Sequence, residues 1–261
     1  MRYLRLLKAL FGINFSRTLI YKGHFIAETI NSVAWGALSI ITILLLTQHI
    51  STVFGWTRNE LILLAVVVNI IYGLLRLFFD INFWRFSEVI HTGELDAVLL
   101  KPVDSQFHMS LWFIDIGGIL RFIIAVGLTI YLLFAFHFAV TLPNAIFAII
   151  LCVAGVTMLY SITYIFLTVT IWYPNLYNLM NVVNGIIGAS RYPKEMYISL
   201  NGAIFFLLLP IIIIISTPTK SLLGKANYFD SLLLILFTII FFSVSRVFWK
   251  FALRFYTSAS G

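Results

Sequence analysis

Hydrophobic positions in this chain of 261 residues gather into long apolar blocks that are separated by shorter polar segments. A helix needs about 20 largely apolar residues to cross the hydrocarbon core of a bilayer. Five blocks come close to or exceed that length, and each predicts a transmembrane helix. They are Phe25–Thr47, Leu61–Phe79, Gly117–Phe136, Ala145–Trp172 and Ser231–Phe248.

A sixth crossing is expected between Trp172 and Ser231, where two shorter segments compete for it. Ala203–Ile215 is a run of apolar residues interrupted by Pro210, a length more typical of a re-entrant or interfacial segment. We favour Leu176–Ser190 as the fifth span, with Ala203–Ile215 re-entrant on the outer side. The alternative makes the second segment the fifth span and places the first on the cytoplasmic surface. Both predict six crossings in one all-α transmembrane domain over residues 1–261.

Three asparagines recur at intervals of three residues in the first of these segments, which places them along one side of a helix. Asparagine facing lipid is costly, so this side is expected to face protein or a water-filled path. The candidate path-lining residues are Asn178, Asn181 and Asn184.

The N-terminal residues 1–23 interleave basic side chains with leucine and phenylalanine. A secretory signal would need an uninterrupted apolar region and a small-residue cleavage site, and neither is present. The spacing predicts an elbow helix that lies in the membrane interface, with its basic side chains directed toward anionic lipid headgroups.

Composition supports a multi-pass membrane protein, because 61% of the residues are hydrophobic, 10% are charged and the mean hydropathy is +1.03. An ordinary soluble domain has about a quarter charged residues. The net charge of +7 therefore indicates topology first, and no nucleic-acid partner is expected. The single cysteine, Cys152, excludes an internal disulfide.

Lysines and arginines are more frequent on one side of the predicted membrane helices than on the other. With the N-terminus inside, eleven of them lie on the cytoplasmic side and five outside. This asymmetry predicts a cell-membrane protein with both termini in the cytoplasm.

One inner segment is unusually rich in charge: VIHTGELDAVLLKPVDSQFH, residues 89–108. Just before it, Arg85 and Glu88 have helical i,i+3 spacing, and Gly93 is placed to end that helix. The segment is either a surface that a partner binds or a connecting loop whose charges act locally. Its charged residues include Glu94, Asp96, Lys101 and Asp104.

The stretch GELDAVLLKPV, preceded by an aromatic-rich helix, resembles the cytoplasmic signature of ABC-2-type transporter permeases, in the branch with Gly-Glu-Leu-Asp followed by Leu-Leu-x-Pro. SRYPKEMY, Pro210 and TPTKSLLG resemble that branch's later pattern. The chain departs from it at Lys101, where arginine is commoner, and at Lys194 and Glu195, where apolar residues are common.

The resemblance implies one half of an exporter: six membrane helices, an elbow at residues 1–23 and a coupling segment at Asp80–Asp104 that docks into a separate cassette ATPase. ATP and magnesium would bind to that ATPase, and a second permease chain, identical or related, would complete the path. Drug-like or lipid-like export is expected by association. The predicted docking residues are Phe83, Trp84, Phe86, Gly93, Glu94, Asp96 and Pro102.

Other functions find little support in the sequence. There is no G-x-x-x-x-G-K-[ST] phosphate loop, no metal-binding histidine spacing and no G-x-S-x-G motif, so the chain itself is not expected to be an enzyme or to bind a cofactor. An ion-coupled secondary transporter is the alternative. Against it, the sequence predicts that Glu28 and Arg121 lie near the inner ends of their helices, from which they can extend to the interface.

Overall fold

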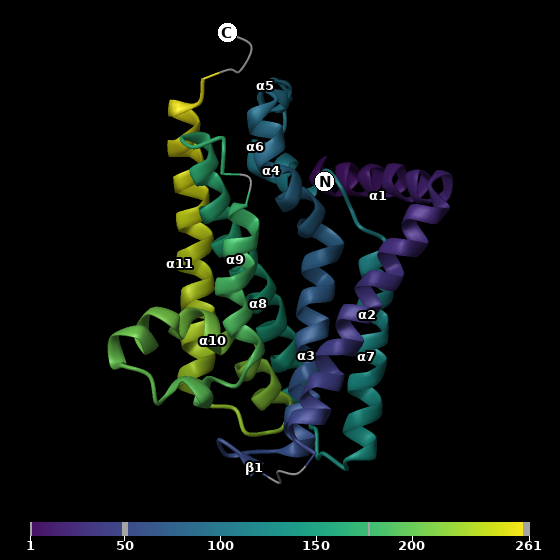
Figure 1. The fold of residues 1–261 in the computed structure, drawn as a ribbon, viewed down its shortest axis with the longest axis vertical. Helices are drawn as coiled ribbons and strands as arrows, with labels where there is room; N and C mark the ends of the chain where they lie inside the picture. The colour runs from purple at the N-terminus through teal and green to yellow at the C-terminus, as the bar shows by residue number, and fades with distance from the viewer. Residues whose placement is uncertain (1, 49–51, 177, 258–261) are drawn as a thin grey trace.

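The computed structural model describes residues 2–48, 52–176 and 178–257 and is built almost entirely of helices (Figure 1). Within these ranges, six helical stretches are long and apolar enough to cross a membrane, which confirms the predicted number. They are Lys22–Leu46, Arg58–His91, Gly117–Ala135, Leu142–Ile171, Gly202–Leu222 and Tyr228–Phe255.

The chain begins with two helices, and a two-stranded hairpin follows the second of them, α2. Pairing of Val53 with Trp56 leaves Phe54 and Gly55 as the turn, both with positive φ (51° and 80°), as a two-residue hairpin turn requires. The first elements are α1 (Arg2–Ile20), α2 (Lys22–Leu46), β1 (Thr52–Val53), β2 (Trp56–Thr57) and α3 (Arg58–Leu75). Then come η1 (Arg76–Asp80), α4 (Ile81–His91), α5 (Glu94–Leu99), α6 (Ser105–Leu111) and α7 (Gly117–Ala135). The chain ends with α8 (Leu142–Thr168), η2 (Val169–Ile171), α9 (Leu179–Ile187), η3 (Gly188–Arg191), η4 (Lys194–Tyr197), α10 (Gly202–Leu222), α11 (Tyr228–Ala252) and η5 (Leu253–Phe255).

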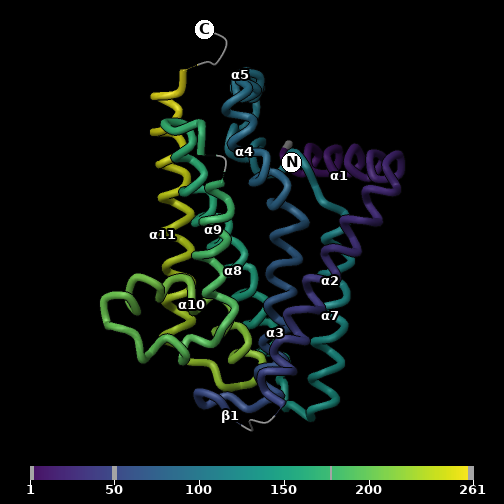
Figure 2. The backbone as a smooth tube through the Cα atoms, viewed as in Figure 1, coloured from purple at the N-terminus to yellow at the C-terminus, as the bar shows by residue number. Residues whose placement is uncertain are grey.

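The bundle has two distinct ends, which the backbone trace shows clearly (Figure 2). At the elbow end, α1 lies across the bundle beside α4, α5 and α6, and the described chain finishes there after α11. At the hairpin end lie β1, β2 and the start of α3. A helix at residues 2–20 agrees with the predicted elbow of residues 1–23.

The core is formed where α3, α8, α10 and α11 pack together. Consecutive isoleucines of α10, Ile211–Ile215, are buried there, and Gly155 of α8 lets the two backbones approach closely. A Cβ on Gly155 would lie 3.2 Å from the carbonyl oxygen of Ile214. A second close approach joins α7 to η1, since a Cβ on Gly118 would lie 2.8 Å from the backbone nitrogen of Leu77.

The fifth crossing differs in part from both sequence interpretations. Helix α9 has only nine residues, too short to span a membrane alone, whereas α10 has 21 and is one of the six candidate spans. Helix length alone therefore favours α10, but Glu195 before this helix pairs with Lys220 near its end, so the chain lies at the same end of the bundle before and after α10. The helix is longer than the apolar run over 203–215, because it begins at Gly202 and continues through Pro210 and Pro218 to Leu222. A re-entrant course for α10 stays a prediction.

Helix α9 packs along α8 with one face buried, which does not fit the alternative's placement of this segment on the cytoplasmic surface. Val183 is fully buried, and the Tyr72 hydroxyl donates a hydrogen bond to the carbonyl oxygen of Ile187 at 3.3 Å. Soon afterwards the chain has reached the hairpin end: Glu195 accepts a hydrogen bond from the indole of Trp56 at 2.8 Å. The return from the elbow end thus runs through α9 and η3, before α10 begins.

Candidate functional site

The predicted coupling segment, residues 80–104, continues directly from the second candidate span. Helices α3 and α4 are joined by the single π-helical turn η1, so the helix runs unbroken from Arg58 to His91. Its far part, α4, emerges at the elbow end and carries α5 and α6 with it (Figure 1). The segment is therefore attached to the membrane-spanning part by a continuous helix.

Glycine ends α4 where the sequence predicts. The helix stops at His91, and Gly93 adopts a left-handed conformation with φ of 76°, which a residue with a Cβ adopts only at a cost. The chain then turns into α5, whose first turn carries Glu94 and Asp96. Acidic groups stabilise the N-terminus of a helix through its dipole, so both carboxylates have a local role as well as any docking role.

Two of the three aromatic side chains predicted to contact the ATPase are buried within this chain, and this part of the prediction needs correction. Phe83 is 4% exposed and packs on Tyr160, with ring centres 5.9 Å apart. Phe86 is fully buried against Tyr164 and Trp249. The amphipathic α4 turns these rings toward α8 and α11, so they anchor the segment to the bundle. Only Trp84, at 47% exposure, lies on the surface.

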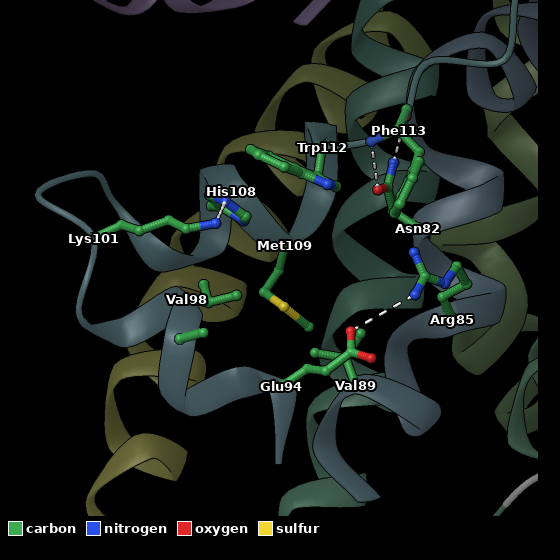
Figure 3. Close-up of a pocket in the computed structure, with 11 residues that line it drawn as sticks. Asn82, Arg85, Val89, Glu94, Val98, Lys101, His108, Met109, Trp112 and Phe113 are labelled. Carbon is green, nitrogen blue, oxygen red and sulfur yellow. Dashed lines mark hydrogen bonds and ion pairs between the residues drawn. The ribbon is translucent and has the colours of Figure 1, made fainter. Parts of the chain in front are cut away.

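The four charges that make the segment unusual all have partners inside the chain. Glu94 lies 3.6 Å from Arg85 in an ion pair, and the Lys101 ammonium lies 2.8 Å from His108 (Figure 3). Asp96 lies close to Tyr256, whose pKa is raised by burial and by this carboxylate. The fourth charge, Asp104, pairs with α11.

Asp104 organises the end of the segment in two ways. Its side chain accepts a hydrogen bond from the backbone N–H of Phe107 at 2.9 Å and so caps α6. It also accepts two hydrogen bonds, each 2.7 Å long, from the Arg246 guanidinium. Hydrogen bonding by Arg246 lowers the pKa of Asp104, and the backbone bond adds to this effect against the cost of burial. The two-bond pair fastens the segment to the last membrane helix.

His108 is a neutral partner of Lys101. An ammonium only donates hydrogen bonds, so Nε2 of His108 must accept this one, which requires an unprotonated nitrogen. Burial and the charge of Lys101 lower the pKa of His108 to about 4, in agreement with that geometry. Trp112 contacts both groups. The His108 ring stacks on the Trp112 ring with their centres 4.4 Å apart, and the Lys101 ammonium lies 4.3 Å from the centre of the Trp112 ring. Figure 3 shows the three side chains together.

A cavity of about 190 Å³ separates α4 and α5 from α6 (Figure 3). Arg85, Glu94, Lys101 and His108 lie on its walls, and Met109 lies between them. The charged groups are therefore distributed around a small gap between the helices rather than concentrated on one outer face.

The segment also exposes an apolar tip, which we define as Leu99, Leu100 and Pro102. Leu100 is 87% exposed and Leu99 is 40% exposed. Pro102 lies in the exposed turn that follows α5. An exposed leucine pair at the end farthest from the bundle core is a surface on which a partner protein can bury apolar area.

The three asparagines of the predicted path do not share one environment. Asn178 and Asn181 are exposed, whereas Asn184 is half-buried and lines a cavity of about 80 Å³ with Tyr72, Arg121 and others. Asn184 alone is therefore placed among polar groups within the bundle. A role in a translocation path stays a prediction for all three.

Two charged residues in the membrane helices were predicted to extend to the interface, and the structure gives each of them a partner within the chain. Glu28 accepts a 2.5 Å hydrogen bond from Arg76, which also donates one of 2.8 Å to Asp115. Arg121 donates two hydrogen bonds to the side-chain oxygen of Asn69. These partners lie 39 to 52 positions apart in the sequence, and the spacing of one chain contains no signal that identifies them.

In the described parts of the chain, no three His, Cys, Asp or Glu side chains are grouped closely enough to hold a metal ion. Cys152 is buried and makes no disulfide.

Comparison with known protein families identifies a match over most of the chain. The family described as ABC-2 family transporter protein matches residues 33–260, which is most of the chain and includes the coupling segment. No curated protein and no solved structure matches the chain significantly.

Proposed function

The chain belongs to the ABC-2 transporter family, and on that basis we propose that it is the membrane-spanning permease subunit of an ATP-binding cassette exporter. It would form half of the translocation path, and two permease chains, identical or related, would form the whole. Energy would come from ATP and magnesium bound to a separate cassette ATPase. The observation that carries the proposal is the family match over residues 33–260.

The architecture supports this proposal. Six candidate spans provide a transmembrane domain, and a helical projection leaves it at the elbow end. We propose that this end, and with it both termini, faces the cytoplasm of a cell membrane. The excess of lysine and arginine on that side of the predicted spans supports this orientation.

The docking surface follows from what the fold leaves exposed. Phe83 and Phe86 hold the segment to the bundle, so the ATPase would contact the apolar tip, with Glu94, Asp96 and the turn at Gly93 beside it. The continuous helix from Arg58 to His91 would transmit movement of the tip to the core, where α3 packs against α7 and α8.

Coexpression with a cassette ATPase encoded in a neighbouring reading frame tests the proposal. We expect the two proteins to copurify, and we expect ATP turnover only when the ATPase is present. Compounds that raise ATP turnover would then identify the substrate class. A chain that transports substrate with no ATPase would contradict the proposal.

The alternative is an ion-coupled secondary transporter. Its best structural support is the charged cluster that joins Arg76 and Glu28, both in candidate spans, to Asp115, just before the third span. Reconstituted transport distinguishes the two: ATP dependence in the presence of the ATPase favours the exporter, and dependence on a proton or sodium gradient without ATP favours the alternative.

A further inference from the structure

A second, larger cavity lies on the other side of α4, where the elbow joins the bundle. Its volume is about 740 Å³, and its walls come from α1, the start of α2, the η1–α4 junction and residues 113–116. This volume lies in the range of small-molecule sites, about 300–1,000 Å³. The cavity belongs neither to the apolar tip nor to the predicted path.

Two arginines from distant parts of the sequence meet on one ring in this cavity. The guanidinium carbons of Arg17 and Arg85 lie 5.1 and 4.5 Å from the centre of Phe113. The two cationic groups are therefore less than about 10 Å apart, each held by a cation–π contact. All three residues line the cavity.

The positive charge at this point is only weakly neutralised by neighbouring carboxylates. Arg17 forms no ion pair with any carboxylate in the described ranges, and Arg85 has only ion pairs of 3.6 Å. Glu28 and Asp115 also line the cavity, but both are bonded to Arg76. Asp80, a further carboxylate on the wall, lies near Arg76 and Arg121.

The remaining walls are amphipathic. Tyr21, Phe25, Ile81 and Trp84 provide apolar and aromatic surface next to the arginines. The cavity lies at the level of α1, which carries exposed apolar residues such as Leu19 and Ile20 and is expected to lie in the membrane interface. A ligand here would meet positive charge and hydrocarbon-like walls at headgroup depth.

We propose that this cavity binds the headgroup of an anionic phospholipid, with its phosphate between Arg17 and Arg85. Guanidinium groups form strong, charge-assisted hydrogen bonds with phosphate oxygens, and Phe113 orients both groups. Trp84, Phe25 and Ile81 would cover the glycerol and the first part of the acyl chains. The bound lipid would fill the space between the elbow and α4.

The test measures lipid retention by the purified full-length chain. The protein is delipidated in detergent and incubated with equal amounts of phosphatidylglycerol and phosphatidylcholine, and bound lipid is counted by native mass spectrometry. Phosphatidylglycerol should be retained preferentially. Arg17→Gln with Arg85→Gln should lower its retention about tenfold, because each change removes a charge-assisted hydrogen bond.

The matched control is Arg5→Gln with Lys8→Gln, which removes the same charge from exposed positions of α1 outside this cavity. It should leave retention within about twofold, because general attraction to the surface contributes much less than a built site. An equal fall in both variants, or no fall in either, would overturn the proposal. If the double variant misfolds, Arg17→Gln alone replaces it in the retention assay, because Arg17 is exposed and its substitution should leave the fold intact.

Glycerol phosphate separates a lipid site from a phosphate site. It lacks acyl chains, so it should not displace phosphatidylglycerol at comparable concentration. Displacement by glycerol phosphate at that concentration would show that the cavity binds a free phosphate ester, and the lipid assignment would then be wrong.

Discussion

Asp104 and Arg246 join the end of the coupling segment to the last membrane helix through two hydrogen bonds of 2.7 Å. Arg246 also donates to the side-chain oxygen of Gln106 at 3.1 Å, so one guanidinium holds the cap and the first turn of α6. Because 142 positions separate the pair, it fixes a tertiary contact that the membrane-spanning helices alone do not specify. The segment is thus attached to the bundle at both of its ends.

Replacing Arg246 with glutamine should loosen this attachment. Two charge-assisted hydrogen bonds are lost and Asp104 keeps an unpaired charge, so we expect a loss of about 1–2 kcal/mol in the free energy of unfolding, after allowance for partial exposure. Thermal unfolding in detergent measures it. Arg254→Gln is the control, because Arg254 is exposed near the same end of the chain. Equal effects of the two changes would show that charge alone, and not the pair, stabilises the fold.

The close approach of α7 to η1 predicts a large effect for a small substitution. A Cβ on Gly118 would meet the backbone of Leu77 at 2.8–3.0 Å, and the backbone cannot rotate away as a flexible side chain can. Gly118→Ala should therefore destabilise the protein by about 1–3 kcal/mol. Gly127→Ala, in the same helix, meets nothing within 4 Å and should be neutral or slightly stabilising. Thermal unfolding of both variants checks the difference.

Hydropathy was sufficient to place most membrane helices, because the length of an apolar run is a local property. It placed the boundaries of α2 and α7 within a few residues. It could not show that the second span continues as one helix to His91, since Arg76, Asp80 and Arg85 make that stretch polar. Arg76 of η1 is neutralised there by ion pairs with Glu28 and Asp115. Because these are long-range contacts, the local sequence does not indicate them.

The helix that Gly93 ends was predicted correctly, but the burial of two of its three predicted docking aromatics was not. The sequence of an amphipathic helix shows that the helix has an apolar face, but it does not show which neighbouring element covers that face. Phe83 and Phe86 are covered by rings of α8 and α11. Leu100, by contrast, follows α5 at the tip and stays exposed.

Acidification should weaken the contact of Lys101 with His108. The folded-state pKa of His108 is about 4, below the usual value of 6.5. Between pH 6.5 and pH 4, therefore, His108 binds a proton in the unfolded chain but not in the folded chain. Stability should therefore fall as the pH drops from about 6.5 toward 4, by on the order of 2 kcal/mol.

Thermal unfolding at a series of pH values from 7.5 to 4.5 measures this dependence. His108→Gln should flatten the profile, whereas His91→Gln, which changes an exposed histidine of α4, should leave the slope unchanged. If the profile of His108→Gln keeps the original slope, another group causes the acid sensitivity.

Reporter fusions test the proposed orientation. A reporter fused after Gly261 should be cytoplasmic, and a tag inserted after Gly55, in the hairpin turn, should be reachable from outside the cell. The hairpin and the C-terminal end of α11 lie at opposite ends of the bundle, so we expect the two readouts to differ. An external C-terminal reporter would contradict the proposed topology.

The charged and apolar parts of the exposed segment give separate tests of docking. Glu94 is half-exposed, and its ion pair with Arg85 is long, at 3.6 Å, and therefore weak. Glu94→Gln with Asp96→Asn should leave the fold intact. If these carboxylates bind the ATPase, losing one charge-assisted contact of about 1.5–3 kcal/mol weakens association by roughly ten- to a hundredfold. Copurification of the ATPase and coupled transport are the measurements.

Leu99→Ser with Leu100→Ser tests the apolar tip in the same assays. Truncating two exposed leucines removes up to about 3 kcal/mol of apolar burial on binding and changes no charge. Since Leu100 is 87% exposed, membrane insertion and unfolding temperature should stay unchanged while copurification falls. Loss with the leucine variant alone would mean that the carboxylates act locally, on Arg85 and on the first turn of α5. Unchanged copurification with both variants would show that the ATPase binds elsewhere on the chain.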